Sequence, residues 1–459
     1  MPASTSPSVA VVGDGAAGVL TVTALLRQAA RTGTRLRVEW VGDGARGRGV
    51  AYATSAPWHR LNVPASGMSV GDADDFPRWL AAHTAAPDTA DDAAVEPGDD
   101  FAQRGDYGSY LLDRLDAARA AARTARLHEH RGRVTDLSVD AAGVQLVAGD
   151  APVRVDRVVL ATGVPTARPV PGLTPAAATH PRLVADPWDG RLDEVTGAGT
   201  VLLVGTGLTM IDAALSLARR APDLRLHAVS RSGLLPRRHV RDRPEPGPPA
   251  VTPRPGLTLD ELVSAVEAQV AAAPQRWREV VDGLRPVTQD LWQVLSHADR
   301  ERFLREHEAR WMRHRHRVAP SVAEEVDALR DTGRLQIEAA AVEEVDAAGE
   351  RLRVRLALRP GGEVRQVEAD WVVSCVGLQY DVRLSDDPLT VSLLRAGLAR
   401  SHALGLGWDC EPDGALRTAA GPSRQLFTLG LLRRGDLYET VGIAEVADQA
   451  ERLGEILVG

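Results

Sequence analysis

One local pattern occurs twice in this chain, and its repetition constrains the fold more than any other feature. In the first copy the apolar run Val9 to Val12 leads into Gly13-Asp14-Gly15-Ala16-Ala17-Gly18 and then into helical residues, Val19 to Ala30. About 190 residues later, Val201 to Val204 leads into Gly205-Thr206-Gly207 and a helix to roughly Arg220. A strand, a glycine turn and a helix in this order open a dinucleotide-binding unit. The repeat predicts an α/β fold with two Rossmann-like domains.

The first motif has a direct physical interpretation. Gly13 permits the tight turn, Gly15 lets the backbone approach a pyrophosphate, and Gly18 lets the helix pack on the strand. Ala16 and Ala17 then belong to a helix N-terminus that faces the phosphates. These residues are therefore predicted to bind a dinucleotide cofactor.

Two acids compete for the ribose of that cofactor. The acid is expected about 20 residues after the motif. Glu39 fits the count, whereas Asp43 lies closer to the tip of the strand Leu36 to Val41, where the ligand would lie. The assignment stays open between them.

The second motif continues as Gly205-Thr206-Gly207-Leu208-Thr209-Met210 and has no third glycine, so it is less specific. The next predicted strand, Leu224 to Val229, ends in Ser230-Arg231-Ser232. A hydroxyl and a guanidinium at that tip suit a 2′-phosphate, and no acid stands there to select a bare ribose. This favours NADP over NAD, with an ordinary surface arginine as the alternative.

Composition excludes several classes of protein. All 54 basic residues are arginine, so Schiff-base chemistry and a phosphate-loop lysine are excluded. A net charge of −8 with mixed signs argues against nucleic acid or a membrane surface as partner. The two cysteines cannot build a disulfide framework or a metal cluster. With no signal-peptide pattern and no apolar run of spanning length, we expect a cytoplasmic protein.

Three further features need interpretation. Asn62 is the only asparagine, so we expect it to contact the cofactor or substrate, with a turn-forming role as the alternative. Arg313-His314-Arg315-His316-Arg317 resembles a metal site, but its arginines repel cations, which favours a solvated or salt-bridged helix end and no metal. Cys375 ends an apolar strand and is most simply a buried small residue.

Other motifs carry a family resemblance. Gly47-Arg48-Gly49-Val50-Ala51-Tyr52, His59-Arg60-Leu61-Asn62-Val63-Pro64-Ala65 and Met68-Ser69 resemble the signature of bacterial FAD/NAD(P)-binding proteins. These flavoproteins have two dinucleotide-binding domains and are distantly similar to flavin-containing and N-hydroxylating monooxygenases. The resemblance covers nearly the whole chain, including Tyr107 to Leu111, Asp186 to Trp188, Ser230 to Pro236 and Gly430 to Gly435 with Glu439.

The resemblance implies FAD at the first glycine motif and NADPH at the second. Beyond the motif residues and Asp43, it implies cofactor contacts at Arg48, Gly49, Tyr52, Asn62, Val63, Met68, Thr162, Gly163, Gly430 and Glu439. The chain departs from the family at Val41, where the ribose-binding glutamate would fall. It departs again at Ser374-Cys375-Val376-Gly377-Leu378, a loop that lies near the flavin in similar folds.

The implied domain order interrupts one domain with the other. A first FAD-binding part (1–195) precedes a first NADP-binding part (196–257), and a helical insert (258–334) follows a proline-rich linker, Arg243 to Gly256. The insert is expected to begin at a capping box, Thr258 to Glu261. The NADP-binding part resumes over 335–370 and the FAD-binding part over 371–459. The polar stretch Ala81 to Asp100 is expected to be a surface loop or insertion.

The expected activity is that of an FAD- and NADPH-dependent oxidoreductase. By analogy with the family, the leading interpretation is a monooxygenase that forms a flavin hydroperoxide and N-hydroxylates a small amine or amino acid, with molecular oxygen as co-substrate. The alternatives are a reductase or dehydrogenase without oxygen insertion, and a flavin-bound redox-sensing or interaction protein that uses the insert as a partner surface. Substrate identity and oligomeric state are left open.

Overall fold

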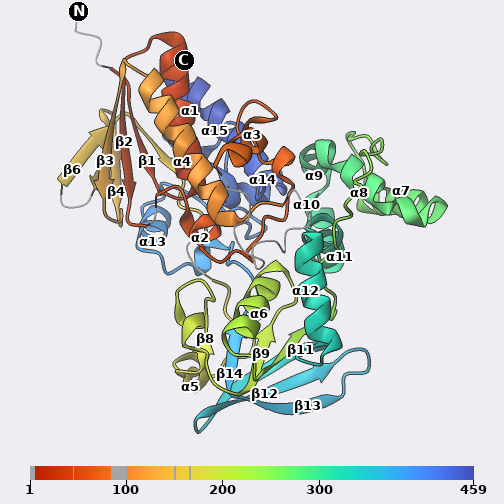
Figure 1. Ribbon diagram of the computed structural model, residues 1–459. Coiled ribbons are helices and arrows are strands. Elements are labelled where there is room, and N and C mark those ends of the chain that lie inside the picture. The colour runs from red at the N-terminus through yellow and green to blue at the C-terminus, as the bar shows by residue number, and fades with distance from the viewer. Residues whose placement is uncertain (1–5, 45, 84–100, 149–150, 165–166) are drawn as a thin grey trace, which may run out of the picture.

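The computed structural model describes residues 6–44, 46–83, 101–148, 151–164 and 167–459. It contains two large, mainly parallel sheets, each flanked by helices, and a helical segment that projects to one side (Figure 1). This architecture confirms the predicted α/β fold with two Rossmann-like units. Most of the expected polar loop, Ala81 to Asp100, lies outside the described residues.

The first unit is built on a six-stranded sheet in the order β15-β16-β7-β1-β2-β3. Four of its parallel strands come from the first part of the chain: β1 (Ser8–Val12), β2 (Leu36–Gly42), β3 (Ala125–Arg131) and β7 (Arg157–Leu160). The C-terminal part adds β16 (Gly421–Thr428), parallel to β7, and β15 (Ala415–Thr418), antiparallel to β16. Two regions far apart in sequence therefore complete one sheet.

Alternate residues of β1 face two different cores. Val9 and Val11 pack with α1 (Ala16–Thr32), α4 (Arg104–Ala121) and α15 (Ile443–Val458). Ala10 and Val12 pack with a small antiparallel sheet of β4 (Leu137–Asp140), β5 (Gly143–Ala148) and β6 (Ala151–Val155), and with α13 (Pro388–Arg395). Both faces of β1 are covered, which explains why all five of its residues are buried.

The second unit is built on a seven-stranded sheet in the order β13-β12-β11-β10-β9-β14-β8. Its parallel strands are β8 (Leu183–Val184), β9 (Gly199–Val204), β10 (Leu224–Ser230), β11 (Leu335–Ala348) and β14 (Trp371–Ser374). β12 (Arg351–Leu358) and β13 (Val364–Ala369) extend it in antiparallel pairs. α6 (Leu208–Arg220) and α12 (Pro320–Asp331) share one apolar core against this sheet.

Two strands and one helix belong to the NADP-binding unit although the sequence places them in other parts of the chain. The expected domain boundaries put β14 in the resumed FAD-binding part and β8 in the first FAD-binding part, but both strands pair within the second sheet. The reason is pairing: Trp371 to Ser374 align with Val201 to Val204, and the valines of β14 are fully buried. α12, expected in the insert, packs with α6.

The insert contains five helices: α7 (Leu259–Ala272), α8 (Trp277–Leu284), α9 (Thr288–Val294), α10 (His297–Glu306) and α11 (Glu308–Arg315). The predicted capping box is confirmed, because Thr258 Oγ1 accepts a bond from Glu261 N and Glu261 Oε2 accepts one from Thr258 N. α7 lies farthest from the two sheets (Figure 1). The short helices α2 (Gly49–Tyr52), α5 (Pro175–Ala178) and α14 (Arg434–Leu437) lie in connecting segments.

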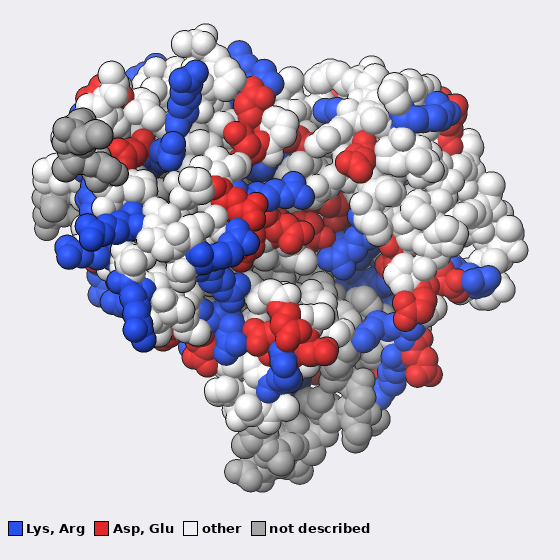
Figure 2. Space-filling view, turned by 90° about the horizontal axis from the view of Figure 1, so that it is seen from above, with Lys and Arg blue, Asp and Glu red and all other residues white. Residues whose placement is uncertain are grey.

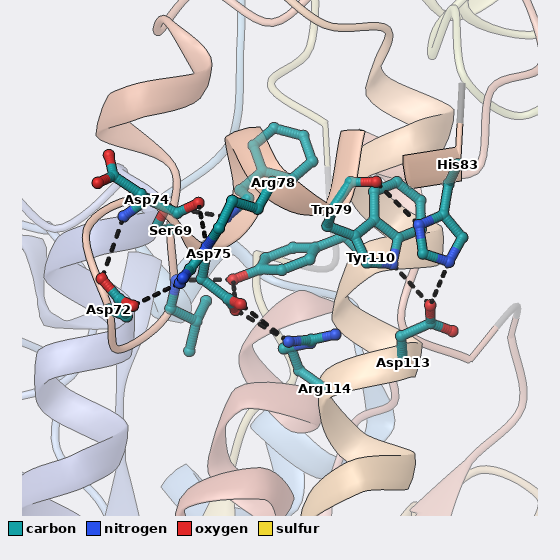
Figure 3. Close-up of polar contacts among 12 residues, drawn as sticks. Ser69, Asp72, Asp74, Asp75, Arg78, Trp79, His83, Tyr110, Asp113 and Arg114 are labelled. Atoms are coloured by element: carbon teal, nitrogen blue, oxygen red, sulfur yellow. Dashed lines mark hydrogen bonds and ion pairs between the residues drawn. The ribbon is translucent and has the colours of Figure 1, made fainter. Parts of the chain in front are cut away.

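α3 (Asp75–His83) is fastened to α4 by polar contacts. Asp75 accepts hydrogen bonds from the Tyr110 hydroxyl and from Arg114, and Asp113 accepts one from the Trp79 indole (Figure 3). These contacts hold α3 on the helix layer that covers the first sheet.

Elsewhere on the surface, arginine and acidic side chains are interspersed on the face seen in Figure 2. No helix among the described residues is long and apolar enough to cross a membrane.

Candidate functional site: two glycine-lined helix N-termini

Two glycines of the first loop, Gly13 and Gly18, have no room for a side chain, whereas the third, Gly15, has room for one. A Cβ on Gly13, whose φ is +114°, would lie 2.3 Å from the Ala161 carbonyl oxygen, and one on Gly18 would lie 2.0 Å from Gly13 O. A Cβ on Gly15 would meet nothing closer than Gly49 Cα at 3.7 Å. Gly15 also caps α1 without any side-chain hydrogen bond to the helix N-terminus. The loop therefore fits a pyrophosphate that approaches Gly15 and the free N–H groups of α1.

Several predicted contacts gather around this N-terminus. Gly47 N donates a hydrogen bond to Asp14 O at 2.8 Å, which brings Arg48 and Gly49 against the loop. A Cβ on Gly13 would lie 3.1 Å from Thr162 N, next to Gly163, and one on Gly430 would lie 3.9 Å from Ala17 Cβ. The structure thus brings three of the predicted segments, at Arg48, Thr162 and Gly430, to the start of α1.

Other predicted contacts lie deeper or elsewhere. Met68 is buried in the first core, and Val63 packs against the same core. Tyr52 lies with its ring centroid 4.9 Å from that of Tyr107, and burial raises the pKa of Tyr52 to about 12. The backbone oxygen of Asn62 accepts a hydrogen bond from His239 Nε2 at 3.1 Å, which places Asn62 where the two units meet.

Three acids, Glu39, Asp43 and Asp14, lie on or beside the end of β2. The buried Glu39 carboxylate is held by Arg37 Nη1 at 2.7 Å and by His130 Nε2 at 2.5 Å, so it is engaged within the sheet. Asp43 is exposed. Asp14, which sequence reasoning missed, reaches over the tip and accepts a hydrogen bond from Gly44 N at 3.0 Å.

The glycine at the end of β2, Gly42, is the sequence feature that could have pointed to Asp14. A Cβ on Gly42 would lie 2.3 Å from Asp14 Cγ, so only glycine leaves room for this carboxylate. The Asp14 carboxylate therefore lies directly beside the end of β2, within the first glycine loop.

The second glycine loop repeats the arrangement of the first. Gly205 has a φ of +120°, and a Cβ there would lie 2.2 Å from Cys375 O. A Cβ on Gly207 would meet no atom within 4 Å, and no side chain caps α6, whose first turn contains Leu208 and Thr209. The loop fits a second pyrophosphate. Met210, at the position of the missing third glycine, is fully buried.

The loop after β14 adjoins this second motif. Cys375 N donates to Val204 O at 2.8 Å, so the loop Ser374 to Leu378, expected near the flavin, lies against Gly205. Cys375 is buried, as predicted, and burial raises the pKa of its thiol. The departure from the family at this loop is therefore placed beside the second dinucleotide motif.

The tip of β10 corrects one predicted donor. Thr206 Oγ1 donates to Leu234 O, so the proton between Thr206 and Ser230 must come from the Ser230 hydroxyl, which also accepts from Gly233 N. Ser230 has no proton left for a phosphate. Arg231 is exposed and makes no hydrogen bond or ion pair with the described residues, so its guanidinium is available to a ligand.

A polar cavity of about 420 Å³ lies beside the first turns of α6. Five arginines line it: Arg237, Arg238, Arg278, Arg313 and Arg330. Asp327 pairs with Arg238 and Arg330. Burial, and to a smaller extent the neighbouring Arg237, lower the pKa of Arg313. This concentration of arginine attracts polyanions toward the second unit.

Glu439 and the basic helix end turn out to be partners. The buried Glu439 carboxylate accepts a hydrogen bond from Trp311 Nε1 at 3.2 Å and pairs with Arg315 at 3.2 Å. Arg317 pairs with both oxygens of Asp282 at 2.9 Å. The interpretation of Arg313 to Arg317 as a salt-bridged helix end is confirmed, and Glu439 ties the C-terminal segment to the insert.

Buried polar contacts fasten α6 to the first unit. His59 Nε2 lies 2.9 Å from Ser216 Oγ, and Arg104 Nη2 pairs with Asp212 at 2.6 Å. Burial raises the pKa of Asp212, whereas the Arg104 charge lowers it. These contacts set the orientation of one glycine loop relative to the other, and spacing along the chain could not reveal them.

Comparison with known proteins bears on the cofactor class and on the fold. Residues 10–165 match the family model described as FAD-NAD(P)-binding, which confirms the predicted resemblance and the predicted cofactor class. No curated protein sequence matches the chain.

Solved structures show the same fold over the whole chain. Ornithine hydroxylase from Pseudomonas aeruginosa in its reduced form has a TM-score of 0.65 at 16% identity, and 99% of each chain is covered. Ornithine N-hydroxylase from Kutzneria sp. 744, with reduced FAD, NADP⁺ and L-ornithine, has a TM-score of 0.64 at 14% identity and the same coverage. L-lysine 6-monooxygenase from Pseudomonas syringae has a TM-score of 0.61 at 17% identity, again with 99% coverage.

Proposed function

We propose that this protein is a monooxygenase that uses FAD and NADPH to N-hydroxylate a small amine or amino acid. The observation that carries the two-cofactor part is the pair of uncapped helix N-termini, each behind a glycine that no protein atom requires, Gly15 and Gly207. The N-hydroxylation part is supported by the likeness in fold to the ornithine and lysine hydroxylases.

The residues of the chain would divide the work of binding. The N-terminus of α1 would hold the pyrophosphate of FAD, and Asp14 would accept hydrogen bonds from its adenosine ribose. The N-terminus of α6 would hold the pyrophosphate of NADPH, and Arg231 would pair with its 2′-phosphate. Bound FAD would supply the redox chemistry, since it accepts a hydride from NADPH and passes electrons to oxygen.

The two cysteines argue against one kind of reductase, the kind that passes electrons through a dithiol of its own chain. Cys375 and Cys410 are both buried and lie in different apolar cores, and burial raises the pKa of each thiol. Thiol–disulfide exchange needs an accessible thiolate. If the protein is a reductase, its acceptor is therefore a small molecule or an external partner rather than a dithiol made by these two residues.

One experiment separates monooxygenase, reductase and non-catalytic flavoprotein. The FAD-loaded protein would be supplied with NADPH and oxygen across a panel of amines and amino acids, while oxygen uptake is recorded and products are weighed by mass spectrometry. A product heavier by one oxygen atom supports the proposal. NADPH oxidation with an artificial acceptor and no oxygenated product indicates a reductase, and no NADPH oxidation at all indicates a sensor or interaction protein.

A further inference from the structure

The helical insert lines an apolar cavity, partly open to solvent, that none of the dinucleotide contacts uses. The cavity measures about 170 Å³ and lies among α7 to α11, with Tyr438 of the C-terminal segment on its wall. Three of the nine tryptophans of the chain line it, Trp277, Trp292 and Trp311, together with Phe303. Aromatic residues make up only 4% of this chain, so their concentration around one cavity is a feature of the insert.

Two of the indole N–H groups and both charged side chains of the lining have protein partners, whereas the buried Tyr438 hydroxyl has no hydrogen-bond partner among the described residues. Trp292 Nε1 donates to Gly435 O at 2.7 Å, and Trp311 Nε1 donates to Glu439. Arg310 pairs with Glu267 at 2.5 Å, so the two charged side chains of the lining neutralise each other. The cavity therefore presents ring faces and hydrocarbon rather than free charge.

Two histidines, His307 and His314, belong to the wall of the cavity. His314 Nδ1 donates to Arg310 O at 2.8 Å, and its ring meets Trp277 edge-on at 5.0 Å. Burial lowers the pKa of His314 from its ordinary value of 6.5, so its ring is neutral at pH 7. His307 stacks on Phe303.

Tyr438, on the wall of the cavity, has a strained backbone conformation. Its φ of 56° and ψ of −63°, with a hydrogen bond from Glu439 N to Leu437 O at 2.7 Å, form a γ-turn of the strained class. The ring stacks on Trp292 at 4.8 Å, and the Arg434 guanidinium lies 5.1 Å from its centroid. Strained non-glycine residues concentrate at ligand sites, where surrounding contacts over-determine them.

We propose that this cavity is a binding site for a small, uncharged, apolar molecule of about the size of one aromatic ring. Apolar cavities of about 150 Å³ stay dry and bind benzene. A charged amine or carboxylate would lose its hydration there without gaining a partner. The proposal goes beyond the proposed function, because neither dinucleotide loop contributes to the cavity and its occupant differs chemically from an amino acid.

The test is calorimetric titration of the FAD-loaded protein with toluene and, in parallel, with benzylamine at pH 7. We expect saturable one-site binding of toluene and at least ten-fold weaker binding of the benzylammonium ion. Val266→Trp, on the cavity side of α7, fills the space and should weaken toluene binding at least ten-fold. Ala268→Trp, on the exposed side of the same helix, should bind toluene like the unmodified protein.

Absence of saturable toluene binding to the unmodified protein overturns the proposal, as does equal binding by Val266→Trp and Ala268→Trp. Equal affinity for toluene and benzylammonium overturns the uncharged character of the occupant. If circular dichroism shows that Val266→Trp does not fold, Val270→Phe, which fills the same cavity with a smaller ring, takes its place and is judged by the same comparison.

Discussion

Replacing Gly15 by alanine should remove FAD and leave the fold intact. Gly15 has a φ of −73° and a ψ of −171°, an extended conformation that any residue adopts, and the new Cβ would make ordinary contact with Gly49 Cα at 3.7 Å. Lower chain entropy in the unfolded state favours alanine by about 0.4–1 kcal/mol. Alanine is a poorer N-cap than glycine by a similar amount. The free energy of unfolding of the apoprotein should therefore change by less than about 1 kcal/mol.

The same substitution should weaken the binding of FAD. The Cβ would stand on the side from which a pyrophosphate approaches the N–H groups of α1, so we expect FAD affinity to fall at least ten-fold, or about 1.4 kcal/mol. Gly15→Val, with a larger side chain, should abolish the yellow colour of the purified protein. Gly13→Ala should behave in the opposite way, because its Cβ would overlap Ala161 O at 2.3 Å and its φ of +114° is strained. That strain alone costs about 1–3 kcal/mol.

The assay measures stability and binding separately, because bound FAD stabilises the folded state by mass action. Thermal unfolding is followed on the apoproteins, and FAD affinity is obtained by fluorescence titration. Gly207→Ala is the matched control at the second loop and should keep FAD while weakening NADPH. Wild-type FAD affinity in a folded Gly15→Ala protein would refute the assignment of FAD to this loop. A loss of stability equal to that of Gly13→Ala would refute the geometric argument.

Three further predictions concern single side chains. Arg231→Ala should raise the NADPH Michaelis constant about ten-fold or more in stopped-flow flavin reduction and leave the NADH constant unaffected, because a charge-assisted pair with phosphate contributes about 1.5–3 kcal/mol. A preference of the unmodified protein for NADH would contradict this prediction. Asn62→Ala should impair flavin reduction or coupling at little cost in stability, and unchanged turnover would show that its scarcity misled us. Burial lowers the pKa of His239 to about 4, so its stabilising contribution is present above pH 6.5 and is lost as pH falls toward 4, by up to about 3 kcal/mol. Urea unfolding of His239→Gln should lack this loss, and an identical pH profile would argue against the burial effect.

The sequence by itself determined the features that depend on neighbours along the chain. The two glycine loops, the helices that follow them and the capping box at Thr258 all formed where predicted, because turns and helix ends are decided by residues a few positions apart. The burial of Cys375 also followed from the apolar run before it.

Only the tertiary structure decided which distant segments meet. β14 lies in the second sheet because it pairs with β9, about 170 residues earlier in the chain. The Ser230 hydroxyl forms a hydrogen bond with Thr206, so its proton is not directed to a phosphate. Asp14 reached the tip of β2 because Gly42 leaves room there, and Glu439 found its partners in the insert. The choice of a hydrogen-bond partner or a strand neighbour depends on three-dimensional packing, which periodicity and spacing along a single chain do not encode.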